Sequence, residues 1–162
     1  MAVRELVPEG DEAAEAEAAQ FFDDLLHIGV LSQFILYSAE DLRRFRDLVA
    51  RGVVPGHRHS VLFVLGRYAE GGSKVSDLDP FLAEGTDRLT WMVCAFGAEE
   101  NAIMQAAIAA GGHCRVGFEN NLLLADGTTA PDNAALVGEV ADAVRRSGRR
   151  PACPDIARAL FS

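Results

Sequence analysis

The chain has 162 residues, of which 49% are hydrophobic and 24% are charged, and its formal net charge at pH 7 is −9. This composition predicts one globular domain over residues 1–162. No stretch approaches the roughly 18 consecutive apolar residues of a membrane span. An acidic surface also repels the phosphates of nucleic acid. We therefore expect neither a membrane nor a nucleic-acid partner.

The cysteines and the amino terminus indicate a cytoplasmic protein. Cys94, Cys114 and Cys153 are irregularly spaced, so they do not resemble a disulfide framework, and no CxxC pair marks a structural zinc site. The first 20 residues are acidic and lack the basic-then-apolar order of a secretory signal. A reducing compartment fits both features.

Short apolar runs alternate along the chain with longer segments of helical periodicity. Asp11 and Ser38 stand where helix N-caps are expected, and the β-branched and aromatic residues of 33–37 are typical of a buried strand. In chain order the pattern predicts strand 3–7, helix 11–28, strand 33–37, helix 39–51, strand 60–65, helix 77–83, strand 89–96, helix 98–110, strand 113–119, helix 132–146 and a short turn or helix at 154–161.

This strand–helix alternation predicts an α/β fold with a parallel sheet. Parallel βαβ units occur in doubly wound sheets and in (β/α) barrels, and the alternation is compatible with both. A nucleotide-binding doubly wound domain is the weaker alternative, because no glycine-rich fingerprint follows a strand.

The predicted strand 113–119 carries the candidate chemistry. Because side chains alternate along a strand, Arg115 and Glu119 lie on one face with His113, and Glu119 falls at the carboxyl end, where α/β enzymes place their sites. A buried arginine and a buried carboxylate must be paired with each other, with a metal or with substrate. From the pattern alone, a structural salt bridge and a reactive site are both open. His113 stands near the strand's start, where core packing is expected.

Residues 111–137, GGHCRVGFENNLLLADGTTAPDNAALV, resemble the closing strand and helix of the β-keto acid cleavage enzymes. That family's usual motif is GGHxRVGxED(N), followed by A-x-x-NA-x-LV. Upstream, QFILYSAEDLRRFRDLVARGVVP, SVLFVLGRY and TWMVCAFG resemble its fifth, sixth and seventh strands with the segments that follow them. The resemblance implies a member of the (β/α)8 TIM-barrel family, here a partial barrel of about five βα units, strands four to eight.

The resemblance also implies an activity. Members of this family are zinc enzymes that exchange a small β-keto acid with acetyl-CoA in a retro-Claisen reaction, giving acetoacetate and a new acyl-CoA. The expected cofactor is Zn2+, with acetyl-CoA as co-substrate. Intact members are oligomeric, so a homo-oligomer is expected as well.

Site residues follow from the motif positions. Glu119 matches the carboxylate ligand of the zinc, and Arg115 matches an arginine that acts with the next acidic residue on the substrate. That residue, usually aspartate, is Asn120 here. Since an amide can only hydrogen-bond, the arginine–acid pair is altered. Arg67 is a weaker candidate for the coenzyme's phosphates, and Gly97 for a close approach of backbone to ligand.

The resemblance places the other two zinc ligands in a His-x-His pair on the family's second strand, outside the predicted five units. A full (β/α)8 barrel needs about 250 residues. His57 and His59 form a His-x-His here, but they precede strand 60–65, on the order of 20 Å from its carboxyl end. We interpret them as loop histidines rather than ligands of the same metal.

A barrel segment has two unpaired sheet edges, and exposed edges favour association. The chain is therefore expected to self-associate or to be completed by another chain. The alternative to an enzyme is a non-catalytic half-barrel that binds a partner through these edges. Three features favour that alternative. The His-x-His pair is outside the predicted units, Asn120 replaces the usual aspartate, and Gln33 stands where the family often has glutamate. Retention of Arg115 and Glu119 favours the enzyme.

Overall fold

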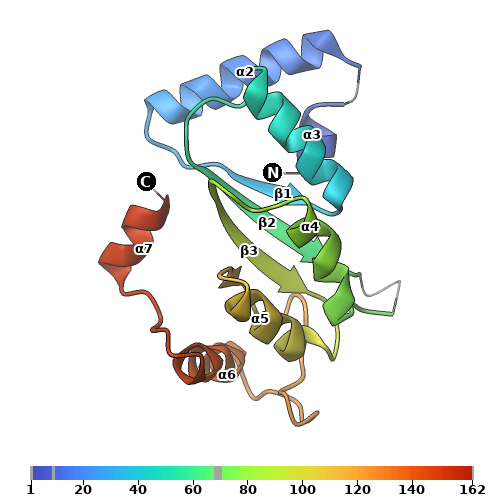
Figure 1. Cartoon of the computed structure of the whole chain (residues 1–162), viewed down its shortest axis with the longest axis vertical. Helices are drawn as coiled ribbons and strands as arrows, with labels where there is room; N and C mark the ends of the chain where they lie inside the picture. The colour runs from blue at the N-terminus through green and yellow to red at the C-terminus, as the bar shows by residue number, and fades with distance from the viewer. Residues whose placement is uncertain (1, 9, 68–70, 162) are drawn as a thin grey trace.

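Four parallel strands form the centre of the protein (Figure 1). In the computed structural model, which describes residues 2–8, 10–67 and 71–161, they lie in the order β1-β2-β3-β4, the order of the chain. The parallel ladder confirms the predicted α/β architecture and is consistent with part of a TIM-like barrel. The strands are β1 Gln33–Leu36, β2 His59–Leu65, β3 Leu89–Ala95 and β4 His113–Cys114.

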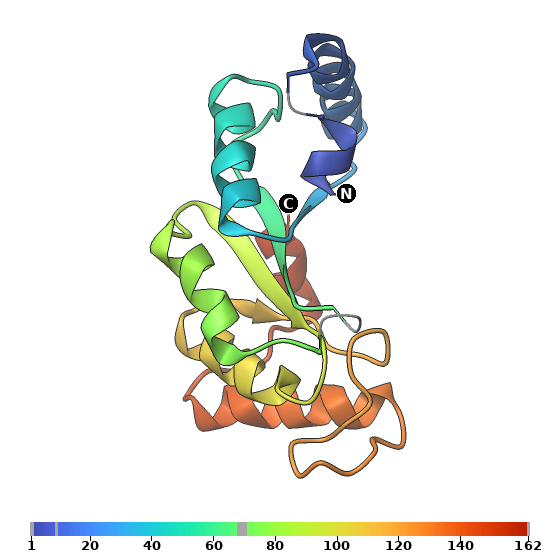
Figure 2. The ribbon, with the colours of Figure 1, turned by 90° about the vertical axis from the view of Figure 1, so that its right-hand side faces the viewer.

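One face of the sheet is covered by helices and contains the main core (Figure 2). Side chains at alternate strand positions, among them Phe34, Phe63 and Trp91, are 5% exposed or less and pack beneath these helices. These helices are α2 Glu12–His27, α3 Ala39–Ala50, the 3-10 turn η2 Val75–Leu78 with α4 Asp79–Ala83, α5 Glu100–Ala109 and α6 Asn133–Arg146. The last helix, α7 Pro154–Phe161, lies on the other face (Figure 1).

Two helix starts confirm the predicted N-caps. The carboxylate of Asp11 accepts a hydrogen bond from the amide of Ala14 at 2.9 Å, and the hydroxyl of Ser38 accepts one from Asp41 at 3.1 Å. Each cap satisfies an amide that has no partner inside the first turn. Local sequence therefore determines where α2 and α3 begin.

The amino-terminal segment is helical, so the predicted strand 3–7 is wrong. Val3–Leu6 forms α1, and Ala2 makes a parallel bridge to Ile35 of β1. A strand at this edge would have a neighbour on one side only. The helical turn satisfies its own backbone instead, with Val7 N donating to the carbonyl of Val3 at 3.0 Å. The described sheet has four strands rather than the expected five.

The last strand is also shorter than the predicted strand 113–119. β4 ends at Cys114, and the amide of Arg115 makes one further bond to a β3 carbonyl at 2.8 Å. Beyond it the backbone curls into a turn, because the amides of residues 120 and 121 both donate to the carbonyl of Gly117. Glu119 therefore lies on a turn past the strand, and the alternation of strand faces does not place it.

The second face of the sheet carries a smaller apolar cluster. Leu62, Val64 and Cys94 are buried there, and Ile35 and Met92 pack partly buried against them. α7 lies on this side of the sheet (Figures 1 and 2), where the Thr90 hydroxyl donates to the carbonyl of Leu160 at 3.3 Å. None of the described helices is both long and apolar enough to cross a membrane.

Candidate active-site residues at the carboxyl edge of the sheet

The loops that follow β2, β3 and β4 meet at the carboxyl edge of the sheet. The amide and the hydroxyl of Ser73, after β2, both donate to the carbonyl of Phe96, at 2.8 and 2.7 Å. The amide of Gly97, after β3, donates to the carbonyl of Asn120 at 3.1 Å. Two of the sequence-predicted residues, Gly97 and Asn120, are thereby brought into direct contact.

Arg115 and Glu119 form an ion pair between the guanidinium Nη2 and the carboxylate Oε2. Both side chains are accessible, at 39% and 68% exposure, rather than buried as the predicted strand implied. The pair is therefore a reachable charge pair at the edge of the sheet. Both groups also lie close enough to influence the Cys94 thiol, whose pKa burial raises to about 11.

Exposure limits what this ion pair contributes to stability. We expect a double-mutant cycle with Arg115→Ala and Glu119→Ala to give a coupling energy below about 1 kcal/mol in metal-free protein, since solvent screens exposed pairs. Urea unfolding of the four variants measures it. A coupling of several kcal/mol would mean that the pair is structural and that its residues are not available to a ligand.

Gly97 has a backbone conformation that only glycine adopts readily. Its φ angle is 92°, and a Cβ atom there would lie 3.2 Å from the Cα of Gly72. The absence of a side chain lets the loops after β2 and β3 approach each other closely. This explains the glycine by loop packing, and a role in binding ligand stays a prediction.

Arg67 lies at the start of the loop after β2 and is exposed. Its guanidinium stands over the ring of Tyr37, 5.4 Å from the centroid, and Arg4 stands over the same ring at 4.7 Å. A neighbouring hollow of about 430 Å³ is lined by Tyr37, Gly66 and Lys74, among others. Positive side chains thus border a hollow at the same edge of the sheet as Arg115.

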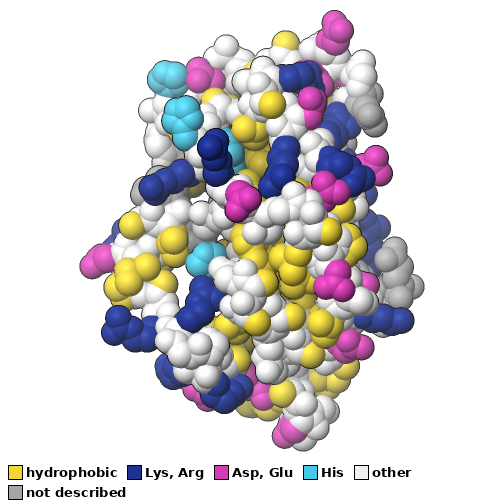
Figure 3. Space-filling view, viewed as in Figure 1, with side chains coloured by type: hydrophobic (Ala, Val, Ile, Leu, Met, Phe, Trp, Pro, Cys, Tyr) yellow, Lys and Arg dark blue, Asp and Glu magenta, His cyan; other side chains and the backbone are white. Residues whose placement is uncertain are grey.

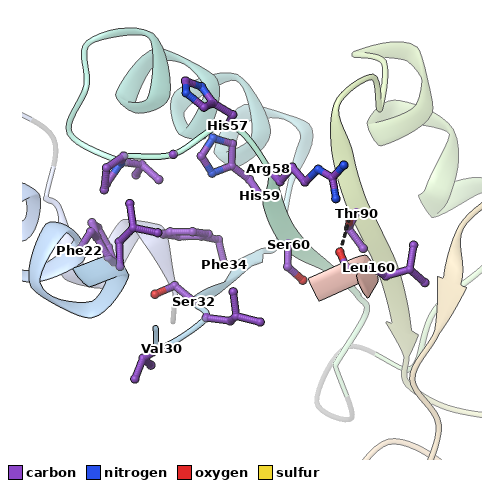
Figure 4. Close-up of a pocket in the computed structure, with 15 residues that line it drawn as sticks. Phe22, Val30, Ser32, Phe34, His57, Arg58, His59, Ser60, Thr90 and Leu160 are labelled. Carbon is purple, nitrogen blue, oxygen red and sulfur yellow. Dashed lines mark hydrogen bonds between the residues drawn. The ribbon is translucent and has the colours of Figure 1, made fainter. Parts of the chain in front are cut away.

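His57 and His59 lie at the opposite edge of the sheet. They line a cavity of about 570 Å³ at the amino ends of β1 and β2, with Phe22, Phe34 and Leu160 (Figure 4). Figure 3 shows histidine side chains gathered on this part of the surface. The predicted separation of this pair from the carboxyl edge is confirmed by its place at the start of β2.

The two histidines differ in their surroundings. His59 is 8% exposed and packs edge-on against the Phe45 ring, and burial lowers the pKa of its imidazole, with a smaller effect from His57. His57 is exposed. Among residues 2–8, 10–67 and 71–161, no group of three histidine, cysteine, aspartate or glutamate side chains is arranged to hold a metal.

One buried residue near the site, Glu100, was not predicted from the sequence. Glu100, the first residue of α5, is 2% exposed, and burial raises the pKa of its carboxyl group to about 7. Its Oε2 accepts a hydrogen bond from the Asn121 side chain at 3.0 Å. The available signal was helical spacing, since Glu100 lies three and four residues before the buried Ile103 and Met104.

The model of the β-keto acid cleavage enzyme family matches residues 8–162. The chain is 37% identical over 101 residues to a 3-keto-5-aminohexanoate cleavage enzyme of Fusobacterium nucleatum, covering 62% of this chain and 36% of that protein. It is 41% identical over 72 residues to a 3-oxoadipate:acetyl-CoA acetyltransferase of Cupriavidus necator, covering 44% and 25%. A second 3-keto-5-aminohexanoate cleavage enzyme, of Acetoanaerobium sticklandii, is 31% identical over 120 residues, covering 71% and 43%.

The matched segments span less than half the length of each of these relatives. Within this chain, however, the family model extends from the segment before α2 to the end of α7. It includes every strand of the described sheet and all five predicted site residues. The chain belongs to the β-keto acid cleavage enzyme family.

Proposed function

We propose that this chain contributes the loops after β2, β3 and β4 to a site that cleaves β-keto acids. The acyl group of the keto acid is transferred to coenzyme A, and the acetyl group of acetyl-CoA joins the remaining carboxymethyl group to give acetoacetate. The observation that carries the proposal is the clustering of Arg115, Glu119 and Asn120 at the carboxyl edge of a parallel sheet. The names of the relatives, a 3-keto-5-aminohexanoate cleavage enzyme and a 3-oxoadipate:acetyl-CoA acetyltransferase, support the substrate class.

The proposed roles follow from the chemistry of each side chain. The accessible Arg115 guanidinium suits the carboxylate of a β-keto acid, which it can bind through two parallel hydrogen bonds. The Asn120 amide can orient a substrate oxygen but cannot remove a proton. Arg67, beside the hollow near Tyr37, would contact the phosphates of acetyl-CoA, and Gly97 would admit the ligand close to the backbone.

Zinc dependence is part of the same proposal, with Glu119 as one ligand. The Glu119 carboxylate, which is 68% exposed, is accessible to a metal, and bound zinc would polarise a substrate carbonyl. The described residues do not by themselves fit a complete zinc site, because no group of three ligand side chains comes together among them. The remaining ligands would come from another copy or another chain.

The second candidate is a non-catalytic half-barrel that binds a partner. It is favoured by the partly exposed apolar face around Ile35 and Met92, and by the exposed Leu26, Ile28 and Leu31 beside the amino ends of the strands. Such surfaces mark protein–protein contacts. A homo-oligomer would cover this face in either case, so assembly alone does not separate the two candidates.

A native mass spectrum of the 162-residue chain with added zinc, followed by an assay for acetoacetate from 3-oxoadipate and acetyl-CoA, tests the proposal. If other copies of this chain supply the remaining zinc ligands, the result is a multimer that binds zinc and forms acetoacetate. Glu119→Gln is expected to weaken zinc binding by about ten-fold or more, because it replaces an anionic ligand with a neutral one. Arg115→Ala should raise KM for the keto acid.

The matched control is the double variant His57→Ala and His59→Ala. These side chains lie at the amino edge of the sheet, so zinc binding and acetoacetate formation should not change. Loss of one zinc equivalent in this control would contradict the proposed ligand. Assembly without zinc binding and without acetoacetate would show that copies of this chain do not complete the site.

A further inference from the structure

A carboxylate lies buried beneath the turn that carries Glu119 and Asn120. Glu100 is 2% exposed, on the face of α5 that also buries Ile103 and Met104. Burying a carboxylate is costly unless its oxygens are bonded. The Glu100 Oε1 atom has no hydrogen-bond partner among the described residues, so Oε2 carries the interaction that offsets the burial.

The partner of Oε2 is the side chain of Asn121, at 3.0 Å. The same Nδ2 group donates to the carbonyl of Leu123 at 2.6 Å, and the Asn121 Oδ1 accepts from the Leu123 amide at 3.0 Å. Every polar atom of this side chain is therefore engaged. The amide is held in one orientation, with its donor end toward Glu100.

Two links connect the beginning of α5 to the turn. The Gly97 amide donates to the carbonyl of Asn120 at 3.1 Å, and Glu100 binds the neighbouring Asn121 through its side chain. The Glu100 amide in turn donates to the carbonyl of Gly97 at 3.1 Å, so the two residues that bind the turn are also bonded to each other. The turn is also bonded to α6, through the Phe118 amide and Asn133 Oδ1 at 2.8 Å.

The exposed ion pair cannot position Glu119 by itself. Its partner Arg115 is 39% exposed, and Glu119 is 68% exposed, so the interaction between them is weak in water. The orientation of Glu119 must then come from the backbone of its turn. The turn is anchored by the buried hydrogen bond from the Asn121 side chain to Glu100 of α5, and by the bond from the Gly97 amide to the carbonyl of Asn120.

We propose that Glu100 is a positioning residue, whose buried carboxyl group holds the 117–121 turn through Asn121 and so fixes where Glu119 and Asn120 stand. This deepens the proposed function, because it assigns a support to the site residues. Glu100 touches no substrate and acts only through its neighbour.

Amide hydrogen exchange on the full 162-residue chain tests the proposal. Glu100→Leu keeps the approximate volume and removes the acceptor, and it should accelerate exchange of the Asn120 and Asn121 amides by about ten-fold or more. Glu100→Gln keeps an acceptor oxygen and should restore slow exchange. Asn121→Ala removes the other partner, and should accelerate the same amides even if Glu100→Leu fails to fold.

Asn101→Ala is the matched control. It removes two side-chain hydrogen bonds of the same helix, the 3.2 Å bond to Glu139 and the 2.7 Å bond from Gln105, and neither involves the turn. The proposal is overturned if folded Glu100→Leu leaves exchange in the turn unchanged, if Asn121→Ala does so, or if the whole sheet exchanges faster to the same extent. These readouts need no catalysis, so they stand apart from the acetoacetate assay.

Discussion

Gly66→Ala is expected to reduce the free energy of unfolding by about 3 kcal/mol. Gly66 follows β2 with a φ angle of 69°, which strains any residue that has a Cβ atom. A Cβ there would lie 2.5 Å from the carbonyl oxygen of Gly72, and this backbone atom cannot turn aside as a flexible side chain would. The backbone strain and the steric clash both destabilise the loop that contains Arg67.

Gly71→Ala provides the matched control in the same loop. Its φ angle is 84°, but no atom of the described residues lies within 4 Å of the added Cβ. Only the backbone strain remains, so a loss of about 1 kcal/mol is expected. Urea unfolding measures both variants. Equal losses would show that the close approach of Gly66 to Gly72 contributes nothing.

Glu100→Gln is expected to increase the free energy of unfolding at neutral pH relative to the unsubstituted protein. The folded state raises the pKa of Glu100 from 4.5 to about 7, because burial penalises its charged form. Between these two values the folded state binds more protons than the unfolded state. Stability from this group is therefore fully present below pH 4.5 and is lost as the pH rises through about 7.

Glutamine has no such titration, so the difference in unfolding free energy between the two proteins should grow across this window. The expected growth is on the order of 2–3 kcal/mol in favour of Glu100→Gln. Urea unfolding at several pH values, with a metal chelator present, gives the difference directly. Parallel stability curves would mean that Glu100 titrates normally and is not desolvated.

Much of the secondary structure could be predicted because it depends on neighbouring residues. Asp11 and Ser38 cap the helices that they precede, and the apolar run at 60–65 falls within β2. Caps and apolar periodicity act over a few residues, so no knowledge of the fold is needed to recognise them. The parallel sheet follows from the alternation of these elements.

The candidate site could be predicted in part. The sequence resemblance predicts Arg115, Glu119 and Asn120 as site residues, and in the structure they lie together at the carboxyl edge of the sheet. The sequence resemblance could not show that the Arg115–Glu119 pair is exposed. Exposure depends on the turn at 117–121, which ends β4 early, and that turn is set by bonds to Gly117 and to the beginning of α5.

By itself the sequence determined the order of the elements from α2 onward, the helix caps and the family to which the chain belongs, since these depend on local patterns and motifs. Only the tertiary structure decided that Val3–Leu6 is helical, that β4 stops at Cys114 and that Glu100 lies under the site. Each of these depends on contacts between distant segments. Edge pairing, loop packing and burial are decided by which residues meet, and spacing along the chain does not specify them.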